Sequence, residues 1–580
     1  MLRRRHGRLR READPAGGAR RGASPGPSFP GLIAPRPHLD NRAIAERLDS
    51  FATLLELAGA NPYSARAYRR AAELVRSTEA PVADLIRAGR VRELRGIGRG
   101  IEARLTELVE TGEIAELEEL ERKVSPDLVG LGLYLGIGAR RAVQIAETLG
   151  IRTADELREA AAAGRLREVP GIGPANEAKL LAALARADEP RPPRGLLIHR
   201  ARRLLAEIAE PLGGTPAGDP RRYRDSSERF AVVVPAEEPR AVLEAFESLP
   251  AIVSVLERGD RRAYGVTVEG VPVEVVVAEP GRFGTELVRA TGSPGYVAAL
   301  EPLPDAPDEA GVYRALGIPF CPPELREEPF RGEPPPLVEL GEIRGDLHVH
   351  TTWSDGTASV EEMALAAIGR GYEYLAICDH TPAVGAVRGL TPDDLRRQAL
   401  EIAETNEALA PFRVLRGTEC DILPDGRLDL PDSILAELDW VQASVHGGQR
   451  LPKREQTKRV EEALRNPHVR CLSHPKGRYI NRRPENELDV DRLIEVALEE
   501  GVALEVNGLP DRLDLRDVYV RQAVEAGVTL VCSTDAHSVR GLQNMELSVA
   551  TARRGRASAP DVLNTRPVNS VLDGRRALRG

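Results

Sequence analysis

Residues 345–350 read Gly-Asp-Leu-His-Val-His, and this segment decides the fold of the C-terminal part of the chain. It is the first of seven short apolar runs, and helical patterns separate most of them. The other six are YEYLAICDH (372–380), RVLRGTEC (413–420), DWVQASVH (439–446), VRCLSH (469–474), VALEVNG (502–508) and VTLVCSTDAH (528–537). Alternation of strand and helix predicts successive βα units, and therefore a parallel sheet or barrel.

Histidine and acidic side chains fall at or just past the ends of these runs. Six of the ten histidines do so: His348, His350, His380, His446, His474 and His537. Three acidic residues join them: Asp355, Glu419 and Asp535. One histidine at a strand end is usually an ordinary polar residue, but the ends of parallel strands meet on one face of a barrel. In an H-x-H pair both rings also point to the same side of the strand. Imidazole and carboxylate groups suit Zn and Mn, so the nine residues predict a multinuclear metal site.

These segments carry a resemblance to a known family. GDLHVHTTWSDG, CDHT, GTECDI, ASVH, SHPKGR and STDAHS resemble the motifs of the PHP (polymerase and histidinol phosphatase) metal-dependent phosphoesterases. A helical domain, helix-hairpin-helix motifs, a nucleotidyltransferase-like palm and then PHP is also the layout of bacterial PolX-type X-family DNA polymerases. YRALGIPFCPPELRE and LNTRPVNSVLD are similar to the junction and the C-terminus of that family. The resemblance covers about residues 40–575.

The resemblance implies a (βα)7 barrel with three divalent metal ions, which would be Zn, Mn or Fe. One ion would be held by His348, His350, Glu419 and Asp535. Glu419 would bridge to a second ion held with His446 and His474, and the third would be held by Asp355, His380 and His537. The residues expected to act in catalysis are Glu419, His446, Asp535 and Arg478. Arg478 is the first choice for gripping phosphate, ahead of Lys476, Arg482, Arg483, Asn507 and Arg512.

The rest of the chain divides by composition and pattern into several regions. We expect a disordered basic tail at 1–38, a helical DNA-binding domain at 39–115, a helix-hairpin-helix region at 116–192, a degenerate palm and thumb-like domain at 193–322, a Pro-rich linker at 323–342 and the PHP domain at 343–575. The fold class is therefore multidomain, α+β and α/β. The tail has no apolar segment of the kind that a signal peptide needs.

Three Gly-Ile-Gly turns in the helical half indicate contact with DNA. They lie at Gly96 and Gly98, at Gly136 and Gly138, and at Gly171 and Gly173. Such a turn exposes backbone N–H groups at a helix N-terminus, which suits a phosphate and reads no base sequence. The expected partner is gapped, nicked or 3′-tailed duplex DNA.

The palm departs from the polymerase pattern. Nucleotidyl transfer needs clustered carboxylates that hold two Mg ions, usually a pair on one strand and a third on a later strand. The first strand offers Glu228, Arg229, Phe230 and Ala231, and the third position holds Glu274. We therefore expect nucleotidyl transfer to be lost and bound Mg to be doubtful in this domain. A lyase activity is also doubtful, because the segment where its lysine would fall contains only Lys123.

Composition restricts the remaining choices. The net charge is −9, so binding to DNA must come from local positively charged patches or from backbone amides. The five cysteines are far apart and give no disulfide framework, which favours a reducing cytoplasm. No apolar stretch is long enough to span a membrane, and we expect a monomer.

The function that best fits these observations is a phosphoesterase acting on DNA. It would be a 3′–5′ exonuclease, or an enzyme that processes 3′ ends or abasic sites in DNA repair. Three alternatives stay open: an active polymerase and exonuclease despite the altered palm, a phosphatase of a small phosphomonoester, and a DNA-binding scaffold with a structural metal cluster.

Overall fold

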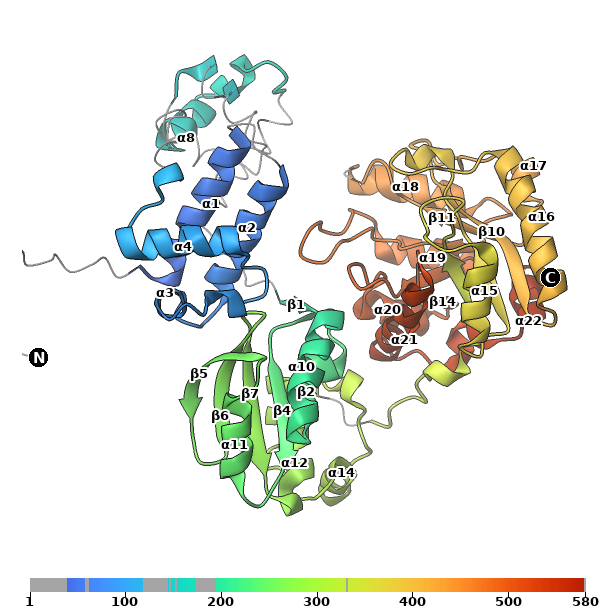
Figure 1. Ribbon diagram of the computed structural model, residues 1–580. Coiled ribbons are helices and arrows are strands. Elements are labelled where there is room, and N and C mark those ends of the chain that lie inside the picture. Colours follow the sequence, from blue (N-terminus) through green and yellow to red (C-terminus); the bar gives the residue numbers. More distant parts are fainter. Residues whose placement is uncertain are drawn as a thin grey trace, which may run out of the picture.

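The computed structural model describes most of the chain (Figure 1). The described residues are 39–57, 62–117, 144–145, 148–151, 154–173, 177, 195–329, 332–449 and 451–577. Three sequence predictions lie outside them: the tail 1–38, the Gly136 and Gly138 turn, and Lys123.

Amphipathic helices form the N-terminal part. They are α1 (Asn41–Leu57), α2 (Pro62–Ser77), α3 (Val82–Arg87) and α4 (Arg99–Thr111), with α8 (Ala154–Ala162) further along the chain. On α1, Ile44, Leu48 and Phe51 recur at helical spacing and are buried. These side chains belong to one hydrophobic core that continues into the next domain, so the helices pack against the palm.

The palm is a five-stranded sheet with the strand order β2-β4-β7-β6-β5. Its strands are β2 (Thr215–Gly218), β4 (Phe230–Pro235), β5 (Ile252–Arg258), β6 (Arg262–Thr267) and β7 (Pro272–Ala278), and a small hairpin pairs β1 (Leu196–Leu197) with β3 (Ser226–Ser227). The helices α10 (Ile198–Leu212) and α11 (Pro239–Glu247) pack on one face, and α12 (Phe283–Thr291) packs on the other. Alternation explains the two layers: Val232 and Val234 face the first pair of helices, whereas Val233 faces α12.

The C-terminal domain is a barrel of seven parallel strands, drawn from yellow to red in Figure 1. Its strands are β8 (Gly345–Val349), β9 (Tyr374–Ile377), β10 (Arg413–Asp421), β11 (Trp440–Ser444), β12 (Cys471–Leu472), β13 (Ala503–Asn507) and β14 (Leu530–Ser533). Each of these strands lies within one of the seven predicted apolar runs or overlaps it. The predicted (βα)7 fold class is confirmed.

The barrel is nearly closed, because contacts just past the end of the last strand join it to the first strand. The backbone N–H of His350 donates to the carbonyl oxygen of Ala536 at 2.9 Å, and a parallel bridge joins Val349 to Ala536. The helices of the domain are α15 (Val360–Ile368), α16 (Pro392–Ala408), α17 (Asp432–Leu435), α18 (Lys453–Leu464), α19 (Val490–Glu500), α20 (Asp517–Ala526), α21 (Met545–Arg554) and α22 (Val568–Ala577). Strand ends on one rim of the barrel thereby come together.

A short helical segment leads from the palm to the barrel. It contains α13 (Pro294–Leu300) and α14 (Glu309–Leu316), which pack around the buried Tyr296 and Tyr313. The expected Pro-rich linker follows, and Glu324 within it accepts a hydrogen bond from Arg553 Nε at 2.8 Å. Among the described helices, none is both long and apolar enough to cross a membrane.

Candidate metal centre

The nine predicted donors lie together at the C-terminal rim of the barrel. His348 lies in β8, and His350 follows one residue after its end. The other donors lie in β10 or in the loops that follow β8, β9, β11, β12 and β14, and they are Asp355, His380, Glu419, His446, His474, Asp535 and His537. Parallel strands therefore gather side chains from the whole length of the domain.

Glu419 lies in the middle of the group and is buried. Its Oε1 atom is 2.7 Å from His474 Nε2 and 3.4 Å from His446 Nε2. Its Oε2 atom is 3.0 Å from His380 Nδ1. The same oxygen is 3.6 Å from His348 Nε2 and 3.7 Å from His350 Nε2. One carboxylate thus reaches five imidazoles, which suits a group that bridges cations.

The two aspartates, Asp355 and Asp535, both lie close to the ring of His350. His350 Nε2 is 3.2 Å from Asp535 Oδ1, and His350 Nδ1 is 3.8 Å from Asp355 Oδ1. Asp355 Oδ2 is also 3.3 Å from His537 Nε2 and 3.6 Å from His380 Nε2. His350 therefore lies between both aspartates.

Three overlapping groups of donors could each hold a metal ion. The groups are His350, Asp355, His380 and His537; His348, His350 and Asp535; and His380, Glu419 and His446, with all ligand atoms of a group within 4.8 Å of one another. This division differs in part from the one that the resemblance implies, because His350 and His380 each belong to two groups and His474 belongs to none of the three. The assignment of each residue to one ion stays a prediction.

The chemistry of these donors fits divalent cations. The Nδ1 atoms of His350 and His474 are buried and make no hydrogen bond. Burial lowers the pKa of His350 to about 3, which keeps a free lone pair on the neutral ring. Burial alone would raise the pKa of Glu419, but the surrounding histidines hold it well below its ordinary value. Buried lone pairs and an ionised carboxylate are what a metal site needs.

Glu505 supports the cluster through contacts with two of its histidine residues, and it was not among the residues predicted from the sequence. The residue lies in β13 with no exposed surface, and its Oε1 atom is 2.6 Å from His348 Nδ1. Its Oε2 atom accepts from the backbone N–H of His474 at 2.6 Å. A carboxylate behind a ligating histidine fixes its tautomer and ring orientation. The signal in the sequence was an acidic residue inside the apolar run VALEVNG.

The structure separates two candidate arginines. Arg478 donates from Nη1 to Asp225 Oδ2 at 2.7 Å and from Nη2 to the carbonyl oxygen of Leu513 at 2.6 Å. Arg512 lies beside the cluster, with its Nε atom 3.8 Å from Asp535 Oδ2. This Nε atom is buried and makes no hydrogen bond. Asn507 Nδ2 donates to Asp535 Oδ2 at 3.1 Å. The other basic residues of the segment are engaged elsewhere: Lys476 with the Leu488 carbonyl, Arg482 with Asp511 and Arg483 with the Gly477 carbonyl.

Two of the three Gly-Ile-Gly turns lie among the described residues, and both are built alike. Gly96 and Gly171 have positive φ angles of 111° and 82°, which favour glycine. Ile97 is buried in the core, whereas no heavy atom lies within 4 Å of where a Cβ at Gly98 would sit. Gly98 precedes the first turn of α4, whose leading N–H groups have no partner within the helix. Such a turn leaves room for a phosphate.

The palm lacks a carboxylate pair at the expected position. Ala231 on β4 lies opposite Glu274 on β7. Arg262 donates to Glu274 at 2.9 Å and to Glu286 at 2.8 Å, so a cation already occupies the neighbourhood of this acid. Asp219 is buried and accepts backbone N–H groups of the segment before β4, which gives it a structural role.

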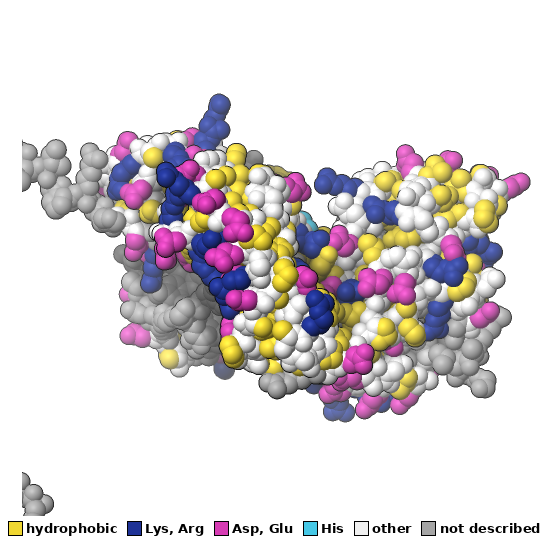
Figure 2. All heavy atoms as spheres, turned by 90° about the horizontal axis from the view of Figure 1, so that it is seen from below, with side chains coloured by type: hydrophobic (Ala, Val, Ile, Leu, Met, Phe, Trp, Pro, Cys, Tyr) yellow, Lys and Arg dark blue, Asp and Glu magenta, His cyan; other side chains and the backbone are white. Residues whose placement is uncertain are grey.

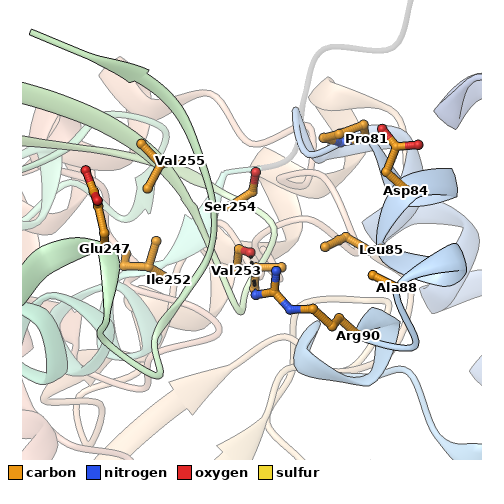
Figure 3. A pocket seen from close by; sticks show the side chains of 10 residues that line it. All are labelled: Pro81, Asp84, Leu85, Ala88, Arg90, Glu247, Ile252, Val253, Ser254 and Val255. Carbon is orange, nitrogen blue, oxygen red and sulfur yellow. Dashed lines mark hydrogen bonds between the residues drawn. The ribbon is translucent and has the colours of Figure 1, made fainter. Parts of the chain in front are cut away.

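A separate pocket lies where the N-terminal helices meet the palm. It has a volume of about 360 Å³ and lies between α3 and β5 (Figure 3). Arg90 crosses it and donates to the carbonyl oxygen of Val253 at 2.9 Å. None of the predicted site residues lines this pocket, and the rest of its lining is mostly apolar.

Charge on the outer surface is mixed. On the face shown in Figure 2, basic and acidic side chains are interspersed. Many arginines of the chain are paired, as in the contacts of Arg95 with Glu207 and of Arg258 with Glu247 at 2.7 Å each. Because basic and acidic side chains are interspersed on this face, the backbone N–H groups at the Gly-Ile-Gly turns are better suited to bind a phosphate than these side chains are.

Comparison with known proteins adds three family matches. Residues 39–114 match a helix-hairpin-helix domain, residues 135–186 match a SAM-like helix-hairpin-helix tandem, and residues 346–507 match the PHP domain. The predicted presence of helix-hairpin-helix and PHP domains is confirmed, and the exact bounds of the domains stay predictions.

Among curated proteins, the chain is similar to the DNA polymerase/3′–5′ exonuclease PolX of Bacillus subtilis. The two are 35% identical over 569 residues, which is 92% of this chain and 99% of the relative. A probable phosphatase of Acetivibrio thermocellus is 33% identical over 201 residues, covering 33% of this chain and 78% of that protein. A probable phosphatase of Caldanaerobacter subterraneus is 30% identical over 203 residues, or 33% of this chain and 75% of that protein.

Proposed function

This chain belongs to the bacterial PolX family, and we propose that it is a metal-dependent phosphoesterase that shortens or trims DNA from the 3′ end. The family relationship rests on similarity along nearly the whole chain. The observation that carries the proposed activity is the gathering of nine donor side chains at one rim of the barrel, with five of the six histidines around the carboxylate of Glu419.

The nine donors would hold three divalent cations, Zn or Mn, with Fe as a further possibility. Histidine and carboxylate ligands accept each of these metals. Bound cations of this kind supply a nucleophile at neutral pH and neutralise charge on phosphate. Within that arrangement, Glu419, His446 and Asp535 would act as ligands of these cations.

We assign the phosphate contact to Arg512 in place of Arg478. Arg512 Nε is buried, lacks a hydrogen bond and points to the side of Asp535, so it can donate to a phosphate oxygen. Its Nη2 donates to Tyr479 Oη at 2.8 Å, which fixes the guanidinium. Arg478 is engaged instead by Asp225 and the Leu513 carbonyl through its two terminal nitrogens, and its role in binding phosphate stays a prediction.

The helical half would bind DNA through hydrogen bonds from protein backbone N–H groups to DNA phosphates. Open space at Gly98 and Gly173 allows a phosphate to approach the N–H groups there. Contacts of this kind read no sequence, which suits an enzyme that acts on ends, gaps or nicks. Processing of 3′ ends in repair is the role that such a substrate implies.

We further propose that the palm does not transfer nucleotides. Ala231 stands where one carboxylate is needed, and Arg262 pairs with Glu274. A missing metal-holding carboxylate costs a polymerase several orders of magnitude in rate. The palm keeps its sheet and its helices, so the loss concerns the chemistry and leaves the fold intact.

A second candidate function is hydrolysis of a small phosphomonoester. It is favoured by the relatives named probable phosphatases, whose similarity covers only about a third of this chain. The helix-hairpin-helix domains argue for DNA, because a small substrate has no need of them.

One experiment compares the candidates. The protein is incubated with 3′-labelled gapped, 3′-tailed and abasic duplexes and with a sugar phosphate, in Mn²⁺ or Zn²⁺, with and without dNTPs. We expect shortened DNA strands, no extended strands and slow release of phosphate from the sugar. Fast hydrolysis of the sugar phosphate with intact DNA would establish the alternative, and DNA shortening by a His350→Ala variant at the wild-type rate would refute the assignment of the site.

A further inference from the structure

The palm and the barrel share an apolar contact. Ile198 from the start of α10 packs with Ile480 and Leu513 of the barrel, and Leu547 of α21 completes the cluster. Ile198 is fully buried. The two domains therefore meet through side chains that are shielded from water, which favours a fixed relative position.

Polar contacts surround this cluster, and two of them come from one barrel loop, residues 474–483. Asn481 Nδ2 donates to the carbonyl oxygen of Gly195 at 2.9 Å. Arg478 Nη1 donates to Asp225 Oδ2 at 2.7 Å, and the Arg478 side chain is only 9% exposed. Asp225 itself is fixed, since its Oδ1 accepts from the backbone N–H of Ser226 at 2.8 Å. A buried and charge-assisted hydrogen bond of this kind resists thermal motion better than an exposed ion pair.

The same loop begins with a donor of the metal cluster. His474 has a φ angle of +27°, which is uncommon for a residue with a side chain and is kept only where the surroundings hold it. The backbone N–H of Gly477 donates to the His474 carbonyl oxygen at 2.9 Å. The N–H of Lys476 donates to Asp514 at 3.2 Å, and Arg478 Nη2 reaches the adjacent Leu513 carbonyl. Contacts through Arg478 thus fix the segment that follows His474.

We propose that the palm acts as a brace for the metal centre, with Asp225 as a positioning residue that holds loop 474–483 through Arg478. The brace keeps His474 Nε2 at Glu419, 2.7 Å away in the structure. This inference rests on the proposed function of the barrel. It explains why a domain without its carboxylates keeps its sheet, its hairpin and the residues that touch the barrel.

The central test is Asp225→Asn in the full-length protein. Asparagine keeps an oxygen for the N–H of Ser226 but turns an NH₂ group toward Arg478, so the brace loses its acceptor. The matched control is Glu546→Gln. Glu546 also joins the two domains, but it does so through Arg202 and Tyr223 of the palm, at 2.6 and 2.7 Å.

The substrate is bis(p-nitrophenyl) phosphate, which is too small to need the DNA-binding half. For Asp225→Asn we expect the Mn²⁺ concentration that gives half-maximal rate to rise about tenfold, as for other groups that orient metal ligands. Glu546→Gln should match the wild type. Calorimetric titration with Mn²⁺ should show the same difference without any turnover, and Arg478→Gln should behave like Asp225→Asn.

Each outcome decides between defined alternatives. Superimposable Mn²⁺ curves for Asp225→Asn and the wild type would overturn the brace, as would a defect seen with DNA but not with the small substrate. Equal defects in Asp225→Asn and Glu546→Gln would also overturn it, because they indicate general loosening of the interface. If Asp225→Asn fails to fold, Arg478→Gln and the partial rescue by Asp225→Glu carry the test. If wild-type protein hydrolyses neither substrate, the proposed function fails, whereas the Mn²⁺ titrations still test the brace.

Discussion

The substitution Glu505→Gln probes how the metal centre is supported. Glu505 is buried under the cluster and receives hydrogen bonds from six groups. The donors are His348 Nδ1, Gln442 Nε2 and Ser533 Oγ on Oε1, and His474 N, Ser473 Oγ and Asn507 Nδ2 on Oε2. Glutamine has nearly the same shape, but it places an NH₂ group where only donors converge.

The magnitude follows from this count. The amide group turns one oxygen into a donor, so at least two hydrogen bonds to a charged acceptor are lost. At roughly 1.5–3 kcal/mol each, the free energy of unfolding should fall by about 4 kcal/mol. His348 also loses the partner that fixes its ring, so Mn²⁺ affinity should fall about 10- to 100-fold.

The stability effect should depend on pH in a defined direction. Burial alone would raise the pKa of Glu505, but pairing with His348 lowers it to about 2. A lowered pKa means that the carboxylate stabilises the fold at pH values above its unfolded-state pKa of about 4.3 and loses this effect as the pH falls toward 2. The contribution of the Glu505 carboxylate to the difference between wild type and variant should therefore shrink as the pH falls below about 4.3.

Urea unfolding of the metal-free proteins measures the stability, and Mn²⁺ titration measures the affinity. The neighbouring change Gln442→Glu is avoided as a control because it adds a charge. Ser533→Ala is suitable, since it removes a single hydrogen bond to Glu505 and should cost about 1.5–3 kcal/mol. A Glu505→Gln variant with wild-type stability and Mn²⁺ affinity within twofold of the wild type would refute the reasoning.

Four further outcomes are expected. His350→Ala should slow Mn²⁺-dependent hydrolysis at least about 100-fold, because this ring lies between two aspartates, and a labelled oligonucleotide assay measures it. Template-dependent dNTP incorporation should be undetectable in the wild type, and incorporation that vanishes in Glu274→Gln would contradict our view of the palm. Gly96→Val and Gly171→Val should each weaken duplex binding in a fluorescence anisotropy assay about fivefold, or roughly 1 kcal/mol, without changing hydrolysis of a small phosphodiester, because positive φ angles exclude a branched side chain. Mn²⁺ at about 100 times its dissociation constant should raise the free energy of unfolding by roughly 2.7 kcal/mol, and EDTA should reverse the gain in a urea titration.

The barrel and its donors could be predicted because the pattern is local. Each strand is a short apolar run, and each ligand-type residue stands at or near the end of one. His348 and His350 are two apart on a strand, so the sequence alone places both rings on one side. Convergence then follows from the parallel sheet, without any knowledge of distances.

The supporting contacts could not be predicted in the same way. Arg478 and Asp225 belong to different domains, and nothing in the sequence near either residue indicates the other. Arg478 therefore resembled a phosphate ligand, since it follows His474 closely. Glu505 was missed because a strand interior was expected to be apolar, although a buried acid there implies a buried partner.

Closure of the barrel through His350 and Ala536 has a consequence for synthesis of the protein. The first and last donors come from opposite ends of the domain, so the set of nine is incomplete until residues 535–537 have left the ribosome. The N-terminal helices, which we propose bind DNA, are translated first and can fold before that point. The order of translation thus places completion of the metal centre after synthesis of the N-terminal helical domains.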